Sequence, residues 1–247
     1  MSVWICCPSA RPVEHVQKWA AAWRERGYGV AIYRDDNEAL GVSDGITTFS
    51  GPGYPGYAAA VNDIIVELLS LVSCANAEWF IAAGDDVYPD PNHMAAEIAA
   101  QCADHFAIVG GTGAKRTYGV MQPTGDRYGE EVYPRVPQKS AYIDRVAGSA
   151  WIGREFARRV NQGKGPLWPE YFHMGCDEEL QAVAMKLGVF WQRPDLTHRH
   201  EHWARKTGRA SDAPAFLARA NSTAEWQKYK KLFAEREAAG FPGSEPL

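Results

Sequence analysis

The sequence predicts an α/β fold, in which a mainly parallel central sheet is flanked by helices and followed by a C-terminal helical extension. Short apolar runs alternate with segments of helical spacing over the first 110 residues, which is typical of a parallel sheet with helices on both faces. The middle of the chain loses this alternation, and the end, from about Ala204, is polar with helical spacing. We therefore expect one domain over residues 1–203 and an extension over residues 204–247.

The elements of the first half follow from where apolar residues stand. Residues 3–7 form an apolar run that stops at a proline, and residues 12–26 place apolar side chains three and four positions apart. These two patterns predict a buried strand and then a helix. By the same reasoning we expect, in chain order, strands at 29–33 and 46–49, a Gly- and Pro-rich turn at 51–56, a helix at 57–73, a strand at 78–83, a helix at 91–103 and a strand at 106–110.

The second half has weaker periodicity. Residues 111–139 are rich in Gly, Pro and Tyr, so strands and loops are expected there. The remaining elements are predicted from short periodic stretches, in chain order a strand-like segment at 142–152, a helix at 154–161, a loop at 161–169, a helix at 177–187, a strand at 189–192 and helices at 215–220 and 224–238.

Composition and charge limit the class of protein. A hydrophobic fraction of 46% and a charged fraction of 23% are ordinary for a folded globular chain. The net charge of −4 gives no bulk attraction to nucleic acid, although a local basic patch stays compatible with DNA. The five cysteines contain no CxxC pair, so no zinc knuckle or disulfide framework is indicated. Without a signal-peptide pattern or an apolar run of about 18 residues, we expect a cytoplasmic protein with no membrane partner.

Two adjacent carboxylates, Asp85 and Asp86, directly follow the predicted fourth strand. In open α/β sheets, ligands bind outside the carboxyl ends of strands. Because neighbouring carboxylates repel each other unless a cation lies beside them, Mg²⁺ or Mn²⁺ is the expected occupant. The alternative is that these residues only cap the turn that follows.

Further acids and histidines stand later in the chain. The acids at 177–179 open a predicted helix, where negative charge also suits the helix dipole. His198, His200 and His202 alternate and would lie on one face of an extended segment. Imidazole is a good ligand for transition metals such as Mn²⁺. A solvated histidine-rich strand is the other interpretation.

These sites occur in an order that resembles the GT-A glycosyltransferases known as family 2. The matching features are, in chain order, Asp36 after the second strand, Gly56 and Asn62 at the start of the long helix, Gly84-Asp85-Asp86-Val87 after the fourth strand, the segment 147–155, Gly175-x-Asp177-x-Glu179-Leu180 and His198-x-His200. The resemblance covers residues 1–203. It implies a Rossmann-like GT-A fold and a transferase that uses a nucleoside-diphosphate sugar, with a UDP-sugar as the favoured donor.

The resemblance also implies a role for each matching residue. Asp86, with His198 or His200, would bind Mn²⁺ or Mg²⁺. Asp177 matches the general base that deprotonates the acceptor hydroxyl in inverting members, and Glu179 would support its helix. The nucleotide-sugar donor would be held by Pro8, Ser9, Arg11, Asp35, Asp36, Asn62 and Asp85.

One departure from the family pattern concerns the metal. Family members often carry an Asp at one or both positions before the acidic pair, where this chain has Ala83 and Gly84. Fewer carboxylates make a histidine ligand more important. The metal itself is needed because the leaving nucleoside diphosphate develops negative charge.

The acceptor is not identified by a motif. In the tail, basic residues are interleaved with aromatic ones, a pattern that can contact phosphates and stack bases, although a solvated helical face is the other interpretation. They are Arg205, Lys206, Arg209, Arg219, Lys228, Lys230 and Lys231 with Trp203, Trp226 and Tyr229. A hydroxymethylated pyrimidine in DNA, as modified by some phage glycosyltransferases, is the first acceptor that we expect, and a glycan or small molecule is the alternative.

Three other functions use part of the same pattern. A metal-dependent phosphoesterase would share the Asp and His residues. A non-catalytic carbohydrate- or nucleic-acid-binding module would keep the fold but has no use for a base at Asp177. A Rossmann dehydrogenase is disfavoured, because the GxGxxG match at 51–56 follows the third strand and contains two prolines, and no acid stands on a following strand about 20 residues on. A nucleophilic Cys176 is disfavoured because a buried lone thiol is usually inert.

Overall fold

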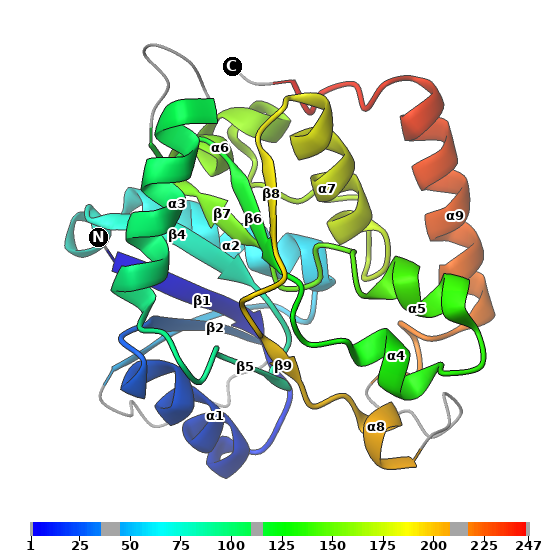
Figure 1. Ribbon diagram of the computed structural model, residues 1–247, viewed down its shortest axis with the longest axis horizontal. Helices are drawn as coiled ribbons and strands as arrows, with labels where there is room; N and C mark the ends of the chain where they lie inside the picture. The colour runs from blue at the N-terminus through cyan, green and yellow to red at the C-terminus, as the bar shows by residue number, and fades with distance from the viewer. Residues whose placement is uncertain (1, 36–44, 110–115, 208–216, 246–247) are drawn as a thin grey trace.

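The computed structural model describes residues 2–35, 45–109, 116–207 and 217–245. A seven-stranded sheet of order β3-β2-β1-β4-β7-β6-β8 runs through the molecule (Figure 1). Its strands are β1 (Ser2–Pro8), β2 (Gly29–Asp35), β3 (Ile46–Gly51), β4 (Ala77–Ala82), β6 (Val120–Pro123), β7 (Trp151–Gly153) and β8 (Phe190–Arg193). Neighbouring strands are parallel except where β7 pairs with β4 and β6.

Helices cover both faces of this sheet, with α1 and α3 on one face and α2 and α6 on the other (Figure 1). The helices are α1 (Val13–Glu25), α2 (Tyr57–Ser70), α3 (Ala95–Val109), α4 (Tyr128–Val132), α5 (Pro137–Ile143), α6 (Arg154–Arg159), α7 (Cys176–Lys186), α8 (Trp203–Thr207) and α9 (Thr223–Ala238), with 3₁₀ turns at Val72–Cys74 and Val160–Gly163. The predicted mainly parallel α/β fold with a C-terminal helical extension is confirmed. No helix within the described ranges is long and apolar enough to cross a membrane.

The strand predicted at 106–110 is wrong. Residues up to Val109 continue α3. The buried side chains of this helix recur at intervals of three and four through Ala99, Cys102, Ala103 and Phe106, so Phe106 belongs to the apolar stripe of the helix. A short apolar run at the end of a helix therefore imitates a strand.

The middle of the chain also differs from expectation. The segment 111–139 includes α4 and the start of α5 in addition to β6, and of the strand-like segment 142–152 only the end belongs to β7. Val146 and Ala147, in the middle of that segment, line a cavity. The helix predicted at 215–220 begins outside the described residues, and residues 218–220 form a turn.

A second, two-stranded sheet brings distant segments together. β5 (Val87–Tyr88) pairs antiparallel with β9 (Arg199–His200), so that Val87 lies opposite His200. The indole N–H groups of Trp19 and Trp23 on α1 both donate to the carbonyl of Val87, at 2.8 and 3.0 Å. Helix α1 thereby fixes the segment that follows β4 and, through β5, the position of β9.

Candidate functional site

One large cavity opens at the carboxyl ends of the parallel strands. Its volume is about 940 Å³, and its walls include the ends of β1, β4 and β6, the start of α7, and parts of α5 and α9. This is the edge of an α/β sheet at which ligands bind. The structure brings the following predicted site residues into this cavity: Pro8, Ser9, Arg11, Asp85, Asp86, Asp177, His198 and His200.

Asp85 is held by residues that follow β1. The Ser9 hydroxyl donates to Asp85 Oδ2 at 2.6 Å, and Arg11 Nε donates to Oδ1 at 3.2 Å. Burial raises the pKa of Asp85, although the Ser9 hydrogen bond and the Arg11 charge act in the opposite direction. Ser9 and Arg11, both predicted to hold the nucleotide sugar, therefore both donate hydrogen bonds to Asp85, a third residue with the same predicted role.

Asp86 points to His200. Asp86 Oδ1 lies 3.3 Å from His200 Nε2, and the Glu201 N–H donates to the carbonyl of Asp86 at 2.7 Å. Burial alone would raise the pKa of Asp86, but the hydrogen bond from His200 and the charges of His200 and His202 outweigh it and lower that pKa. Asp86 is therefore an ionised carboxylate with an imidazole beside it.

His198 has different surroundings from His200. It is only 3% exposed, its ring packs edge-on against Trp23, and its Nε2 accepts a hydrogen bond from Trp151 Nε1 at 3.2 Å. Burial lowers the pKa of His198 to about 4, so the ring is neutral. The Nε2 lone pair is already used, which leaves His200 as the better ligand. Within the described part of the chain, no three His, Cys, Asp or Glu side chains are grouped as a complete metal shell.

Asp177 stands in the first turn of α7, beyond Gly175. Gly175 has φ +92°, and a side chain there would collide with the rings of Tyr229 and Tyr171. Asp177 Oδ1 accepts from the Glu178 N–H at 3.0 Å. Burial, with the neighbouring Glu178 charge, raises the pKa of Asp177 to about 6. The result is a carboxylate in the cavity wall that changes its protonation close to neutral pH.

Of the three remaining residues predicted to hold the donor, the structure describes the side chain of Asn62 alone. Asn62 does not line the cavity. Its buried side chain forms two hydrogen bonds to the backbone of Leu167. Asn62 Nδ2 donates to the Leu167 carbonyl at 2.6 Å, and Asn62 Oδ1 accepts from the Leu167 N–H at 3.0 Å. Asp35 ends β2, where its backbone pairs with Gly51, and Asp36 lies outside the described residues.

Other cavity residues were not predicted. Tyr57, His173 and Tyr128 line the cavity. The Tyr57 and His173 rings pack edge to face, and burial lowers the pKa of His173. The Tyr128 hydroxyl lies 2.9 Å from His202 Nδ1. The alternation of histidines pointed to His202, and the aromatic stretch before the predicted helix at 177–187 contains His173, whereas the sequence did not mark Tyr57 or Tyr128 as site residues.

Comparison with known proteins adds little about function. No protein-family model matches the chain, and no curated protein matches it. One similar solved structure is the crystal structure of mannose-1-phosphate geranyltransferase from Thermus thermophilus, with 14% identity and a TM-score of 0.34 over 50% of this chain. The match covers 41% of that chain, less than half of its length. A likeness of this size carries no argument about activity.

Proposed function

We propose that the protein is a metal-dependent, inverting glycosyltransferase that moves a sugar from a nucleoside-diphosphate sugar, with a UDP-sugar as first candidate, to an acceptor hydroxyl. One observation carries this proposal. The ionised Asp86 beside His200, and Asp177 with a pKa of about 6, face the same cavity of about 940 Å³. A phosphate-binding cation and a proton acceptor in one cavity are what glycosyl transfer requires.

Asp86 and His200 fit the ion as a pair of protein ligands. Mn²⁺ accepts both carboxylate oxygen and imidazole nitrogen. Both carboxylate oxygens of Asp85 already have partners, Ser9 and Arg11, so Asp86 is the member of the acidic pair that we assign to the ion. Ions of this kind keep several positions for waters and substrate phosphates. When bound, the cation would neutralise the charge that develops on the leaving diphosphate.

Asp177 would act as the general base. Its pKa of about 6 leaves it ionised above neutral pH while keeping it basic enough to accept a proton. The acceptor oxygen forms a bond to the anomeric carbon, and the bond from that carbon to the diphosphate oxygen breaks. The hydroxyl proton passes to Asp177, and the nucleoside diphosphate leaves with the electron pair of the broken bond.

The charges around the cavity favour an uncharged acceptor, a sugar or small polyol, over DNA. The cavity wall holds six Asp and Glu side chains and four Lys and Arg side chains within the described residues. Each of these four cations has a partner. Arg11 forms an ion pair with Asp85 and Arg127 with Glu130. Arg219 lies over the Phe172 ring and Lys139 over the Tyr133 ring.

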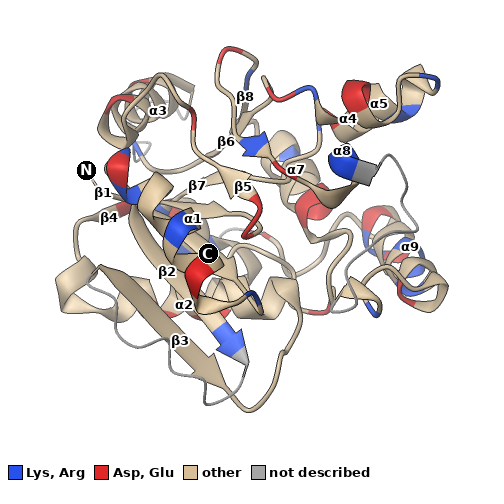
Figure 2. Cartoon of the chain, turned by 90° about the horizontal axis from the view of Figure 1, so that it is seen from below, with Lys and Arg blue, Asp and Glu red and all other residues tan. Residues whose placement is uncertain are grey.

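Part of the basic and aromatic pattern considered for DNA binding lies on helix α9. Acidic and basic residues are mixed along this helix (Figure 2). Lys228 pairs with Glu225 at 3.0 Å and Lys231 with Glu235 at 3.9 Å. A polyanion would have to displace these pairs, so a hydroxymethylated pyrimidine in DNA becomes the second candidate acceptor.

Thermal unfolding with nucleotide sugars tests the donor half of the proposal. A ligand that binds only the folded state raises its stability, so one member of a panel of UDP-, GDP-, CDP- and ADP-sugars should raise the melting temperature with Mn²⁺ present. The Asp86→Ala variant should lose this increase. No shift with any donor would contradict the proposal, and phosphate release from simple esters without a sugar nucleotide would favour the phosphoesterase.

The acceptor is tested separately. With the identified donor and Mn²⁺, we expect transfer to neutral oligosaccharides or polyols and no salt-sensitive retardation of hydroxymethylated duplex DNA in a gel. Salt-sensitive binding of that DNA together with sugar transfer to it would reverse the order of the two acceptor candidates.

A further inference from the structure

A buried ion pair joins the C-terminal extension to the helix that begins beside Asp177. Arg236 on α9 donates from Nε and Nη2 to the two carboxylate oxygens of Glu179 on α7, at 2.8 and 2.6 Å. Arg236 is 8% exposed and Glu179 is 2% exposed. Glu179 stands two residues after Asp177, in the first turn of the same helix.

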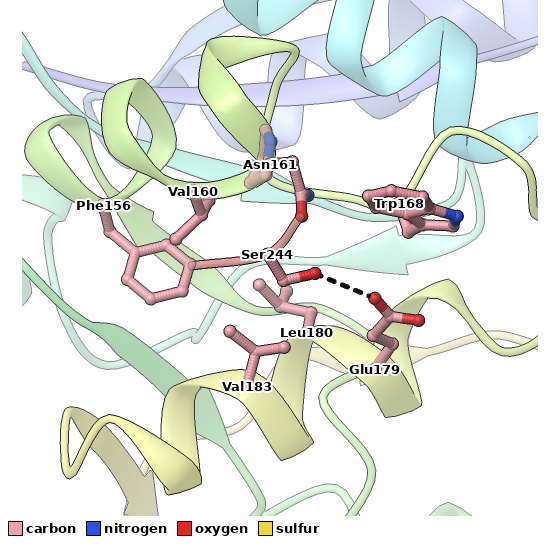
Figure 3. Close-up of a pocket in the computed structure, with 9 residues that line it drawn as sticks. Phe156, Val160, Asn161, Trp168, Glu179, Leu180, Val183 and Ser244 are labelled. Atoms are coloured by element: carbon pink, nitrogen blue, oxygen red, sulfur yellow. Dashed lines mark hydrogen bonds between the residues drawn. The ribbon is translucent and has the colours of Figure 1, made fainter. Parts of the chain in front are cut away.

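Further hydrogen bonds tie this ion pair to other segments. The Tyr171 hydroxyl donates to Glu179 Oε2 at 2.8 Å, and the Ser244 hydroxyl donates to Oε1 at 3.1 Å. Arg236 Nη1 donates to the Pro242 carbonyl at 3.2 Å. Figure 3 shows Glu179 and Ser244 joined beside Trp168, and the Arg236 guanidinium lies 3.3 Å from the centre of the Trp168 ring.

This cluster connects three parts of the chain that matter to the cavity. Besides α7 and α9, it holds the segment that includes Trp168 and Tyr171, which continues directly into the cavity residues Phe172 and His173. A buried ion pair can be neutral or unfavourable for stability compared with an apolar pair. A satisfied polar cluster does, however, fix one arrangement of the segments that it joins.

We infer that Arg236 is a positioning residue for Asp177, and that the C-terminal extension is needed to complete the site. The inference rests on the proposed function, since it assigns the use of Asp177 to that reaction. Arg236 contacts neither Asp86 nor His200 through any described hydrogen bond, so it should govern the base and not the metal pair.

Arg236→Lys is the sharpest variant, because lysine keeps the charge but lacks the planar fork that binds both carboxylate oxygens. Lys231→Ala, on the exposed side of the same helix, is the matched control. With both proteins assayed well below their melting temperatures, we expect Arg236→Lys to lower kcat by about tenfold or more, as a small displacement of a catalytic group does. The donor KM should change by less than about twofold, and Lys231→Ala should behave as wild type.

Two readouts separate positioning from a general loss of folded enzyme. Amide hydrogens of residues 176–180 should exchange faster in Arg236→Lys and not in Lys231→Ala. The acid limb of kcat/KM should move to lower pH as water reaches Asp177. The groups around Asp177 are Glu178 and Cys176 on α7, Tyr57 on α2, Tyr142 on α5 and Tyr229 on α9, and the substitution changes none of them.

Unchanged kcat and exchange in Arg236→Lys would overturn the inference. A lower kcat would also overturn it if neither the acid limb nor the amide exchange of α7 changed. A smaller fraction of active protein would be enough to explain that result. If the wild-type chain transfers no sugar, the proposed function fails. The exchange comparison then still decides whether Arg236 fixes the first turn of α7.

Discussion

The Asp177 carboxyl is more basic in the folded protein than in an unfolded chain, with a pKa of about 6 against the ordinary value of 3.8. Well below pH 3.8 it is neutral in both states and costs nothing. Between about pH 3.8 and 6 the unfolded chain ionises this carboxyl before the folded protein does, so the fold loses stability over this range, and the full cost is present above about pH 6. The stability cost is therefore present at the pH at which the proposed base works.

We predict that Asp177→Asn makes the protein more stable and inactive. At pH 8 the free energy of unfolding should rise by on the order of 1–3 kcal/mol, the upper figure corresponding to about two pKa units. At pH 4 the gain should be much smaller, because the unfolded chain is only partly ionised at that pH. Urea unfolding at both pH values measures this, with sugar transfer assayed in parallel. An equal gain at both pH values would show that ionisation is not the cause, and persisting transfer would exclude Asp177 as the base.

The two candidate metal histidines should respond differently to substitution. His200→Ala should remove most of the Mn²⁺-dependent stabilisation by donor and leave stability without ligand nearly unchanged, because His200 lies at the cavity edge beside Asp86. His198→Ala should instead cost about 2–4 kcal/mol, because it opens a cavity and leaves the Trp151 N–H without an acceptor. Thermal unfolding of both variants with and without Mn²⁺ and donor distinguishes them, and the reverse pattern would identify His198 as the ligand.

At the scale of elements, α2 is tied to the segment after α6 by one side chain. We predict that Asn62→Ala destabilises the protein by about 2–4 kcal/mol, because both backbone groups of Leu167 lose their buried partner. Donor affinity should stay as in wild type, since Asn62 lies outside the cavity. The exposed neighbour Asp63→Ala is the control. Weaker donor binding in a stably folded Asn62→Ala protein would restore the donor-binding role suggested by resemblance.

The elements that were predicted correctly are those whose pattern is local. The first strand and α1 have clear apolar spacing, and Gly27, with φ +84°, ends the helix as a glycine should. The error at 106–110 arose because periodicity cannot distinguish a short strand from the last turn of a buried helix. The predicted strand at 142–152 contains Val146 and Ala147, whose apolar side chains line the cavity. Apolar residues that line a binding site can therefore be mistaken for a buried strand.

Several charged residues that the sequence analysis proposed for a site do lie together in the cavity wall. Asp86 stood out because it follows a predicted strand, His200 because it alternates with two other histidines, and Asp177 because of the family resemblance. The distinction between His198 and His200 was not in the sequence, since it depends on Trp151, which a different strand brings to the His198 ring. The Arg236–Glu179 pair was hidden for the same reason, because two segments 57 residues apart must pack before it exists.

At the scale of the molecule, the extension is packed into the domain through that pair. A chain ending at residue 203, the predicted domain boundary, would leave the buried Glu179 charge without its partner, a change that costs about 3–5 kcal/mol in buried pairs. We predict that this truncated chain unfolds at markedly lower urea concentration than the full chain. Adding Glu179→Gln to the truncated chain should recover part of the loss. Equal stability of truncated and full chains would show that residues 1–203 are an independent domain.

The two-stranded β5–β9 sheet has a consequence for the order in which the molecule forms. Asp90, just after β5, accepts a hydrogen bond from Thr197, 107 residues further along the chain. Contacts between such distant residues form late, because the entropy of closing a long loop is lost before any contact compensates for it. We therefore expect Asp86 and His200 to meet only after most of the sheet is in place, so that a refolding chain regains its helices and strands before this proposed pair of metal ligands forms.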